Sequence, residues 1–421
     1  MQRFLILGIF FFGPLTVTSW AVPIEHYIAR RVAEATSVTT GYTAITGTAE
    51  TGTVASTNGW IDNTNFTVGE RYLILCWGFY NGSSTSGNYG LRVTHGGTSF
   101  TESESVVEPS QTLTTYKHPY FWFTVWTAAN EDLEVQIYRG AAGGTGQVED
   151  ITLVAINAEA LITDGDLQYN IDTVGGTLST TLTTKTSVTW TPANNGDTWL
   201  VMSYGRFNVN AVTGDNYEQR LVLAGTNMTT AIQDGEDTTD TPIMPAAYAR
   251  TFTNASTTIA LQLRYALTSH AWLAAGIFAL RLNAVESFII NATAGTQAMG
   301  AGDDLYNQLA TATLVPRLTS NWIVTGGCIF DDNGAETTGR IQLNNVDITD
   351  EQGGQNWAST DQVPFIAADV LEYEARTSVG AWDLDGRETG NTTNPEGEDC
   401  WLAAFSLSTY DRTRRVETVN E

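Results

Sequence analysis

Gly69-Glu-Arg-Tyr72-Leu-Ile-Leu-Cys76 is an apolar stretch that opens with an aromatic residue directly after a turn. The pattern returns as Gly196-Asp-Thr-Trp199-Leu-Val-Met202 and as Ser320-Asn-Trp322-Ile-Val-Thr325. The aromatic residues Tyr72, Trp199 and Trp322 are nearly evenly spaced along the chain. Self-similarity at a near-constant spacing is the sequence signature of a structural unit that occurs several times in one chain.

Three further landmarks follow each aromatic residue in the same order and at similar distances along the sequence. The first is an arginine at the head of a short strand: Arg92, Arg220 and Arg340. The second is another arginine: Arg139, Arg264 and Arg387. The third is a leucine in a closing apolar strand: Leu153, Leu273 and Leu402. This common order predicts three units, over residues 44–160, 161–285 and 286–409.

Within each unit the residues follow the pattern of β-strands. Segments such as Tyr120–Trp126 and Leu133–Tyr138 alternate large apolar residues with small or polar ones, which indicates strands with one buried face. Asn195-Gly196 and Gly96-Gly97 are turn signals. Units of about 120 residues with roughly eight short strands are typical of jelly rolls. We therefore predict an all-β protein of three tandem jelly-roll-like antiparallel β-sandwich units.

The chain before the first unit, residues 1–43, is predicted to be a leader and an N-terminal arm. An apolar stretch follows Arg3, and Ser19-Trp20-Ala21 resembles a small-x-small cleavage site. Residues 1–21 are therefore a possible signal peptide, and a retained segment is the open alternative. The segment Ile24–Ala35 is the one place where the pattern predicts a helix, because it follows Pro23 and spaces its apolar residues accordingly.

Residues 410–421 form a charged tail, and no other stretch of the sequence is long enough to span a membrane. The chain carries 46 acidic and 20 basic side chains and a net charge of −26. Nucleic-acid binding depends on clustered Lys and Arg, so a nucleic-acid partner is not expected. The charge is instead typical of a protein that stays soluble at high local concentration.

The order of the landmarks resembles the tandem jelly-roll repeats of phage virion proteins and of related prokaryotic surface proteins. The stretch Arg31-Val-Ala-Glu-Ala-Thr-Ser-Val-Thr-Thr-Gly41 also resembles an opening found in phage structural proteins. The resemblance covers residues 31–409 and implies a capsid decoration, head-fibre or tail protein. The leader before Arg31 departs from this pattern, because phage virion proteins usually carry no signal.

The sequence offers no catalytic, cofactor-binding or metal-binding residues. The four histidines, His26, His95, His118 and His270, form no HxxxH or HExxH pair, and no GxSxG or P-loop motif is present. The three cysteines form no CxxC pair. Because Cys76 and Cys328 lie within apolar runs, we expect buried free thiols rather than a disulfide framework.

Two weaker signals are compatible with ligands. The acidic stretches 331–336 and 383–386 supply oxygen ligands of the kind that Ca²⁺ prefers, although solvated acidic turns are the simpler interpretation. Aromatic side chains could form a platform for sugar rings, although core packing is the simpler role for most of them. The candidates are Tyr80, Tyr89, Trp126 and Trp357.

The repeated arginines stand out because basic residues are scarce in this chain. An arginine at a strand end can pair with a carboxylate and cover apolar surface with its stem, so we expect a structural role.

These features favour a non-enzymatic structural protein of a virion or an extracellular assembly, with a secreted adhesin or carbohydrate-binding protein as the alternative. Its expected partners are copies of itself, major capsid or tail proteins, and surface glycans. A homotrimer is the first expectation, and a pseudo-three-fold arrangement within one chain is the competing geometry.

Overall fold

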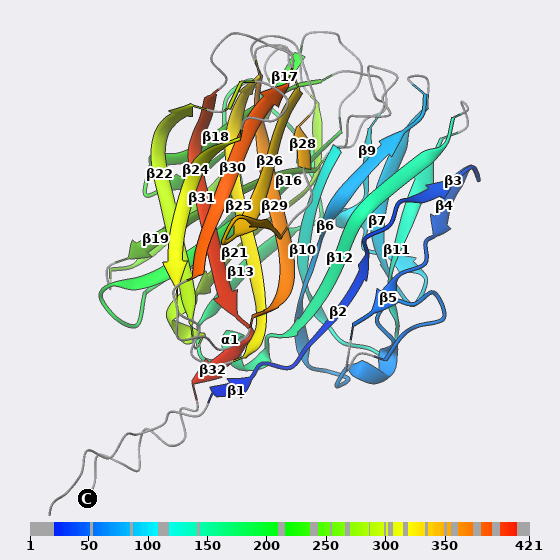
Figure 1. The fold of residues 1–421 in the computed structure, drawn as a ribbon, viewed down its shortest axis with the longest axis horizontal. Coiled ribbons are helices and arrows are strands. Elements are labelled where there is room, and N and C mark those ends of the chain that lie inside the picture. Colours follow the sequence, from blue (N-terminus) through cyan, green and yellow to red (C-terminus); the bar gives the residue numbers. More distant parts are fainter. Residues whose placement is uncertain are drawn as a thin grey trace, which may run out of the picture.

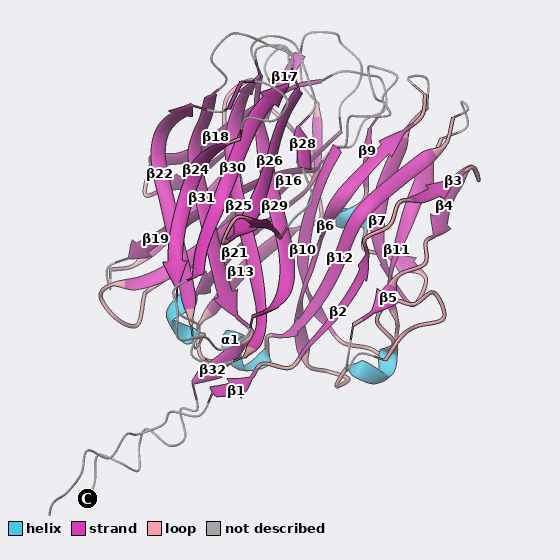
Figure 2. Ribbon diagram, in the orientation of Figure 1, coloured by secondary structure: helices cyan, strands magenta, loops and turns pink. Residues whose placement is uncertain are grey.

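The computed structural model describes most of the chain, and strands make up nearly all of its regular structure (Figure 2). The described residues are 21–50, 54–84, 87–107, 118–140, 144–208, 215–235, 243–252, 255–265, 270–285, 287–298, 300–301, 306–314, 319–332, 336–348, 352–354, 361–373, 380–389 and 396–410. The possible signal peptide, apart from Ala21, and the charged tail after Tyr410 lie outside these ranges.

Three β-sandwiches follow one another along the chain, and all three have the same strand order. If the main strands of a sandwich are numbered one to eight, one sheet has the order 1-8-3-6 and the other has the order 2-7-4-5. This is the connectivity of a jelly roll. The sheet 1-8-3-6 is called the inner sheet below, and the sheet 2-7-4-5 is called the outer sheet. The predicted fold class of three jelly-roll-like sandwiches is confirmed.

The first sandwich holds the β-strands between residues 26 and 157 (Figure 1). Its inner sheet consists of β2 (His26–Arg31), β12 (Gly146–Asn157), β6 (Arg71–Gly82) and β10 (His118–Thr127), with β3 (Ala35–Ser37) beside β12 and β5 (Thr48–Ala49) beside β2. Its outer sheet consists of β4 (Gly41–Ala44), β11 (Leu133–Arg139), β7 (Tyr89–His95), β8 (Thr98–Ser99) and β9 (Ser105–Val107).

The second sandwich holds the strands between residues 167 and 281. Its inner sheet consists of β13 (Leu167–Asp172), β21 (Ala271–Arg281), β16 (Asp197–Asn208) and β19 (Ile243–Phe252), with β14 (Gly176–Thr177) beside β21. Its outer sheet consists of β15 (Thr183–Trp190), β20 (Thr257–Tyr265), β17 (Asp215–Leu223) and β18 (Thr226–Gly235).

The third sandwich holds the strands between residues 288 and 406. Its inner sheet consists of β22 (Phe288–Ala298), β31 (Glu396–Ser406), β25 (Ser320–Asp332) and β29 (Asp361–Tyr373). Its outer sheet consists of β24 (Asn307–Leu314), β30 (Gly380–Thr389), β26 (Glu336–Leu343), β27 (Val346–Asp347) and β28 (Gln352–Gly354), with β23 (Gly300–Ala301) parallel to β30. A bridge between Ile232 and Gln362 links β29 to β18 of the second sandwich.

Short elements join the sandwiches and their ends. The helix α1 (Glu159–Thr163) lies between the first and second sandwiches, and the 3-10 turn η3 (Leu282–Ala284) lies between the second and third. Two further 3-10 turns belong to the first sandwich: η1 (Asn63–Asn65) and η2 (Thr101–Ser103). The strand β1 (Ala21–Pro23) pairs with β32 (Ser408–Tyr410), so the two ends of the described chain meet (Figure 1). No helix of the described residues is long and apolar enough to cross a membrane.

The three aromatic landmarks occupy equivalent positions, as the sequence predicted. Tyr72, Trp199 and Trp322 all lie near the start of the third strand of their sandwich, and each side chain is buried. Their partners on the eighth strand are Asn157, Arg281 and Ser406. This common register makes it possible to check the other landmarks position by position.

The closing leucines are not all equivalent. Leu153 and Leu402 lie opposite the residue four positions after the aromatic landmark, but in the second sandwich Ile277 takes this place, opposite Ser203. The prediction that Leu273 is the equivalent residue was therefore wrong. The prediction rested on a short Leu-Ala-Ala motif, which lies at a different register in β21. The apolar run of β21 is long enough for such a motif to match at two registers.

The second set of arginines also differs by one position in the first sandwich. Arg264 and Arg387 pair with the residue two positions before the first arginine landmark, and in the first sandwich Tyr138 pairs with the corresponding Gly90. Arg139 lies one residue further along β11 and pairs with Tyr89. A slightly longer spacing from the aromatic landmark in the first unit was the only sign of this shift in the sequence.

The predicted helix at Ile24–Ala35 was wrong, because this segment contains β2 and β3. β2 pairs with β12 on one side and with β5 on the other. Ile28 and Ala29 are both buried, so both faces of the strand are covered, although Ile24, Ile28 and Val32 also match a helical spacing. Burial in a sheet outweighs the small differences in helix propensity. The strand precedes residue 44 but belongs to the inner sheet of the first sandwich.

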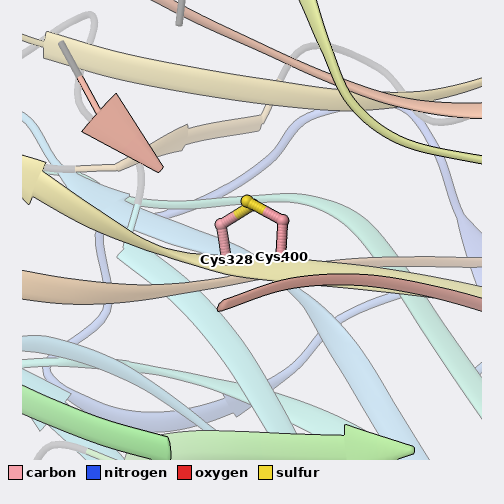
Figure 3. Close-up of a disulfide and its surroundings, with 2 residues drawn as sticks. All are labelled: Cys328 and Cys400. Carbon is pink, nitrogen blue, oxygen red and sulfur yellow. A yellow bond between two sulfur atoms is a disulfide. The ribbon is translucent and has the colours of Figure 1, made fainter. Parts of the chain in front are cut away.

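The expectation of free thiols holds for Cys76 and fails for Cys328. Cys76 is buried and free, and burial raises the pKa of its thiol. Cys328 and Cys400 form a disulfide between the neighbouring strands β25 and β31 (Figure 3). Their Cα atoms are 4.2 Å apart at an irregularity in the register of the two strands. An odd number of cysteines excluded a complete set of disulfides but not a single bond.

We expect Trp199→Ala to lower the free energy of unfolding by about 3–5 kcal/mol, because it removes a fully buried indole from the second core. Val174→Ala is the control: Val174 is 92% exposed, so its change should stay within about 0.5 kcal/mol. Both values can be measured by urea denaturation. Equal effects of the two substitutions would contradict the assignment of Trp199 to the core.

The disulfide closes a loop between residues 72 positions apart in the sequence. Replacing both Cys328 and Cys400 by Ala should lower the free energy of unfolding by about 2–4 kcal/mol, mainly because the unfolded chain regains conformational freedom. A reductant should destabilise the wild-type protein by a similar amount and leave the double variant unchanged. A wild-type protein whose denaturation midpoint ignores reductant would rule out this contribution.

Candidate functional site: the junction of the inner sheets

The central strands of the inner sheets are buried on both faces. Along β16, Trp199 and Val201 point into the core of the second sandwich, while Leu200 and Met202 belong to a different cluster that extends across all three sandwiches. The continuous apolar runs of the sequence follow from this double burial, since a strand covered on both faces has no polar side. The outer sheets alternate instead, as the buried and half-buried residues of β11 do.

The outward faces of the three inner sheets meet in one shared apolar core, called the junction below. The first sandwich contributes residues such as Phe121 and Phe123, the second Tyr204 and Phe278, and the third Trp401 and Phe405. Phe123 makes edge-to-face contacts with Tyr204 and Phe278, at centroid distances of 5.0 and 4.6 Å. Such aromatic pairs add about 0.5–1.5 kcal/mol each to the gain from burial.

Equivalent strands meet at the centre of the junction. β10, β19 and β29 are the sixth strands of the three sandwiches, and each of them contacts the other two. Two of the edges also pack in the same way. The first strand of the third sandwich, β22, contacts the sixth strand of the second, β19, and Arg30 on β2, the first strand of the first sandwich, reaches β29, the sixth strand of the third. The three sandwiches therefore meet through equivalent strands at the centre of the junction.

A buried arginine joins the first and second sandwiches. Arg206 on β16 donates hydrogen bonds to the backbone oxygen of Thr101 and to the Glu104 carboxylate, the latter at 3.3 Å. Arg92 of the first sandwich donates to the same carboxylate at 3.1 Å. Burial lowers the pKa of Arg206 and raises that of nearby Glu102. Removing one partner of such a pair leaves a buried charge without compensation, which costs about 3–5 kcal/mol.

Polar contacts join the first and third sandwiches. The Asn321 amide donates to His26 Nε2 at 2.8 Å, and His26 Nδ1 donates to the Ile24 carbonyl at 2.6 Å. These two bonds fix the neutral imidazole, and burial lowers its pKa accordingly. Nearby, Arg30 lies 3.3 Å from both Glu50 and Asp369.

A cleft of about 600 Å³ opens beside these contacts. Four carboxylates line it, and Arg30 is the one basic residue among the described residues of its lining. The full lining is Ile28, Arg30, Glu50, Asn321, Asp347, Ile348, Asp369, Val370, Leu371 and Glu372. Among the described residues, no group of three or more His, Cys, Asp or Glu side chains is arranged to hold a metal ion. The described residues that line the cleft include no thiol, hydroxyl or imidazole that could act as a nucleophile.

The histidines that the sequence left open pack against aromatic rings. His95 lies 2.5 Å from Glu131 and against Phe100, and His118 stacks on Tyr80. His270 packs against Tyr265. These surroundings are those of structural side chains.

Of the two acidic stretches that could bind calcium, the structure describes the side chains of only one. The loop 331–336 lies outside the residues whose side chains are described. Asp383 and Asp385 are buried: Gln308 donates to Asp383 at 2.5 Å, and Arg340 lies 3.5 Å from Asp385, whose pKa burial raises to about 6.

The aromatic platform is not formed by its described members. Tyr80 and Tyr89 are buried, and Trp126 packs edge to face on Phe66. Trp357 lies outside the described residues. The rings of the described candidates therefore serve the core of the first sandwich.

The first set of repeated arginines has one shared arrangement. Each lies on the fourth strand and reaches the residue opposite on the seventh: Arg92 Nε donates to Gln136, Arg220 Nε donates to Gln262, and Arg340 Nε lies beside Asp385. Two of them also cover a tyrosine ring, Arg92 over Tyr42 at 3.6 Å and Arg340 over Tyr306 at 3.9 Å.

The second set of arginines has no shared arrangement. Arg139 donates to the carbonyls of Gly144 and Val38, and Arg264 pairs with Glu218. The side chain of Arg387 lies outside the described part of the chain.

Two asparagines that sequence reasoning missed link the first strand of the inner sheet to the second strand of the outer sheet in the second and third sandwiches. Asn170 on β13 donates to the carbonyl of Ser187 on β15 at 3.2 Å, and Asn291 on β22 donates to the carbonyl of Thr311 on β24. Asn170 and Asn291 are equivalent, since they pair with the equivalent residues Ile277 and Leu402. The only signal in the sequence was their spacing, which is close to that of the landmarks.

No family model matches the sequence, and no curated protein matches it. Solved structures with some similarity include a protein of Sulfolobus turreted icosahedral virus (9% identity over 81% of this chain and 82% of that chain, TM-score 0.21). An archaeal virus protein with a triple jelly-roll fold covers 81% of both chains at 8% identity and a TM-score of 0.17. The VP2 subviral particle of infectious bursal disease virus covers 95% of this chain and 85% of that chain at 10% identity and a TM-score of 0.22. Scores this low carry no weight for fold or function, which rest on the geometry above.

Acid should weaken the fold through His118, which begins β10. Burial lowers the pKa of His118 to about 3, whereas an unfolded chain has a histidine pKa near 6.5. The free energy of unfolding is therefore highest above pH 6.5, where His118 is neutral in both states. It falls as the pH drops from 6.5 towards 3, because only the unfolded state takes up the proton in this range.

Between pH 6.5 and 5 the wild-type protein should lose about 2 kcal/mol more stability than His118→Gln. Urea denaturation at several pH values measures the difference. Identical pH slopes for the two proteins would show that His118 titrates normally in the folded state.

Proposed function

We propose that this protein is a non-enzymatic structural subunit of a virion or an extracellular assembly, as a capsid decoration, head-fibre or tail component of a phage would be. The observation that carries the proposal is the junction. One chain brings three jelly rolls together through their equivalent sixth strands and buries the central strands of their inner sheets on both faces. Such a chain is one body with three similar lobes, which is a form that suits repeated contacts in a larger structure.

The junction also bears on the expected homotrimer. A trimer of single jelly rolls would place equivalent strands around an axis. The mutual contacts of β10, β19 and β29 support such an arrangement within one chain. We favour this competing geometry, in which a single chain supplies the three lobes. Multi-angle light scattering on the purified protein decides the question, since only the homotrimer has three times the mass of the chain.

The structural role is tested by locating the protein. Mass spectrometry and immunogold electron microscopy of purified particles should find it as a stoichiometric component at a fixed place on the particle surface. Its presence only in the culture medium or on cells, together with binding to defined glycans on an array, would favour the secreted adhesin or carbohydrate-binding protein. Specific hydrolysis of a polysaccharide would overturn the non-enzymatic assignment.

A further inference from the structure

The edge strands of the three outer sheets differ in how well they are protected against pairing with another strand. Among the described strands, the second strand of each sandwich lies at the end of the outer sheet: β4, β15 and β24. An exposed edge strand offers unpaired backbone groups to any other strand, and proteins usually protect such edges with charged side chains, bulges or short length. β4 has four residues, and Arg139 donates to the carbonyl of Val38 just before it.

β15 and β24 share a bulge at the same position but fill it differently. The register shifts between Thr184 and Thr186 on β15, and between Gln308 and Ala310 on β24, opposite equivalent residues of the seventh strand. The extra residue is Lys185 in the second sandwich and Leu309 in the third. Leu309 is buried in the third core, so β24 lacks the cation that protects β15.

The stretch after this bulge is uncharged and favours pairing. It reads Ala310-Thr-Ala-Thr-Leu314, and Thr311 and Thr313 are exposed. The Thr311 carbonyl accepts its hydrogen bond from Asn291, a side chain of β22 and not of β30, so it points away from β30. Because the N–H and C=O of one residue point the same way in a strand, Thr311 and Thr313 both direct their backbone groups outward.

We propose that β24 is a self-association edge, where the β24 strands of two copies pair antiparallel around a two-fold axis. With Ala312 at the axis, Thr311 of each copy lies opposite Thr313 of the other, and threonine pairs of this kind stabilise antiparallel sheets. The incoming Thr313 N–H takes the place of the Asn291 amide at the Thr311 carbonyl. The half-buried side chain of Leu314 gains apolar cover from Ala310 of the other copy.

The occupant is a second copy of this chain rather than a different protein, because the edge is complementary to itself. Chains with a net charge of −26 repel one another over most of their surface, and this edge is a long one without charge. The pairing would join two outer sheets into one continuous sheet. The inference rests on the proposed structural role, for which it supplies one contact between subunits.

Thr311→Pro tests the proposal on the full-length chain. Proline removes the outward N–H of Thr311 and leaves the bonds between β24 and β30 in place, because proline is tolerated on edge strands in this orientation. Ser187→Pro is the matched control, since Ser187 is the equivalent residue on β15 and its carbonyl is likewise bound by an asparagine, Asn170. Far-UV circular dichroism and a thermal melt verify that each variant is folded.

Sedimentation equilibrium over a wide concentration range should show a dimer for the wild-type protein and for Ser187→Pro. The dissociation constant of Thr311→Pro should rise at least tenfold. If Thr311→Pro does not fold, Thr313→Lys provides the same test. It brings the lysines of the two copies near each other across the two-fold axis, and their like charges should oppose the pairing.

Hydrogen exchange should also show protection of the Thr311 and Thr313 amides only at high concentration. A wild-type monomer at all concentrations, or a dimer that both β24 variants leave intact, would overturn the edge proposal. The proposed function fails separately, because the protein could be absent from particles and still dimerise, or be present in particles as a monomer.

Discussion

The double burial of the inner sheets is the constraint on which the rest of the structure depends. Each inner sheet must be apolar on both faces, because one face covers its own sandwich and the other lies in the junction. An isolated sandwich would expose the junction face, with residues such as Leu200, Met202 and Phe278, to water. At about 25 cal/mol per Å² of apolar surface, that exposure would cost each unit much of its net stability. The three jelly rolls therefore depend on one another, although the second and third each also have a core of their own.

The sequence was sufficient for the fold class because its strongest signals come from this double burial. Tyr72, Trp199 and Trp322 begin runs that are covered on both faces, and the few polar residues in these runs make them conspicuous. The junction itself could not be predicted, because a continuous apolar run does not say what covers its second face. The same ambiguity explains why Leu273 was predicted at the position that Ile277 occupies, since both lie in one uninterrupted apolar strand.

Local patterns failed where a contact distant in sequence decides the outcome. His26–Arg31 is a strand only because β12, from the far end of the same sandwich, pairs with it. The pairing of Cys328 with Cys400 depends on a bulge in which Asp399 adopts a positive φ of 48°. The first sandwich has the same bulge at Asp150, with Gly78 and Ile151 in the places of the two cysteines. The backbone feature is common to both sandwiches, and the covalent bond is an addition of the third.

The polar contacts between the sandwiches differ from one pair of sandwiches to the next. Three similar sandwiches could otherwise exchange places around the junction. Arg206 of the second sandwich binds Glu104 of the first, whereas the contacts between the first and third use Asn321, His26 and the ion pair of Arg30 with Asp369. A buried charge tolerates only a partner of the opposite charge, so Arg206 opposes any arrangement that places another sandwich at this position. The apolar junction supplies most of the attraction without selecting among similar sheets. The polar pairs around it make one arrangement of the three lobes more favourable than its permutations, which is how nearly equivalent units come to occupy fixed places in one chain.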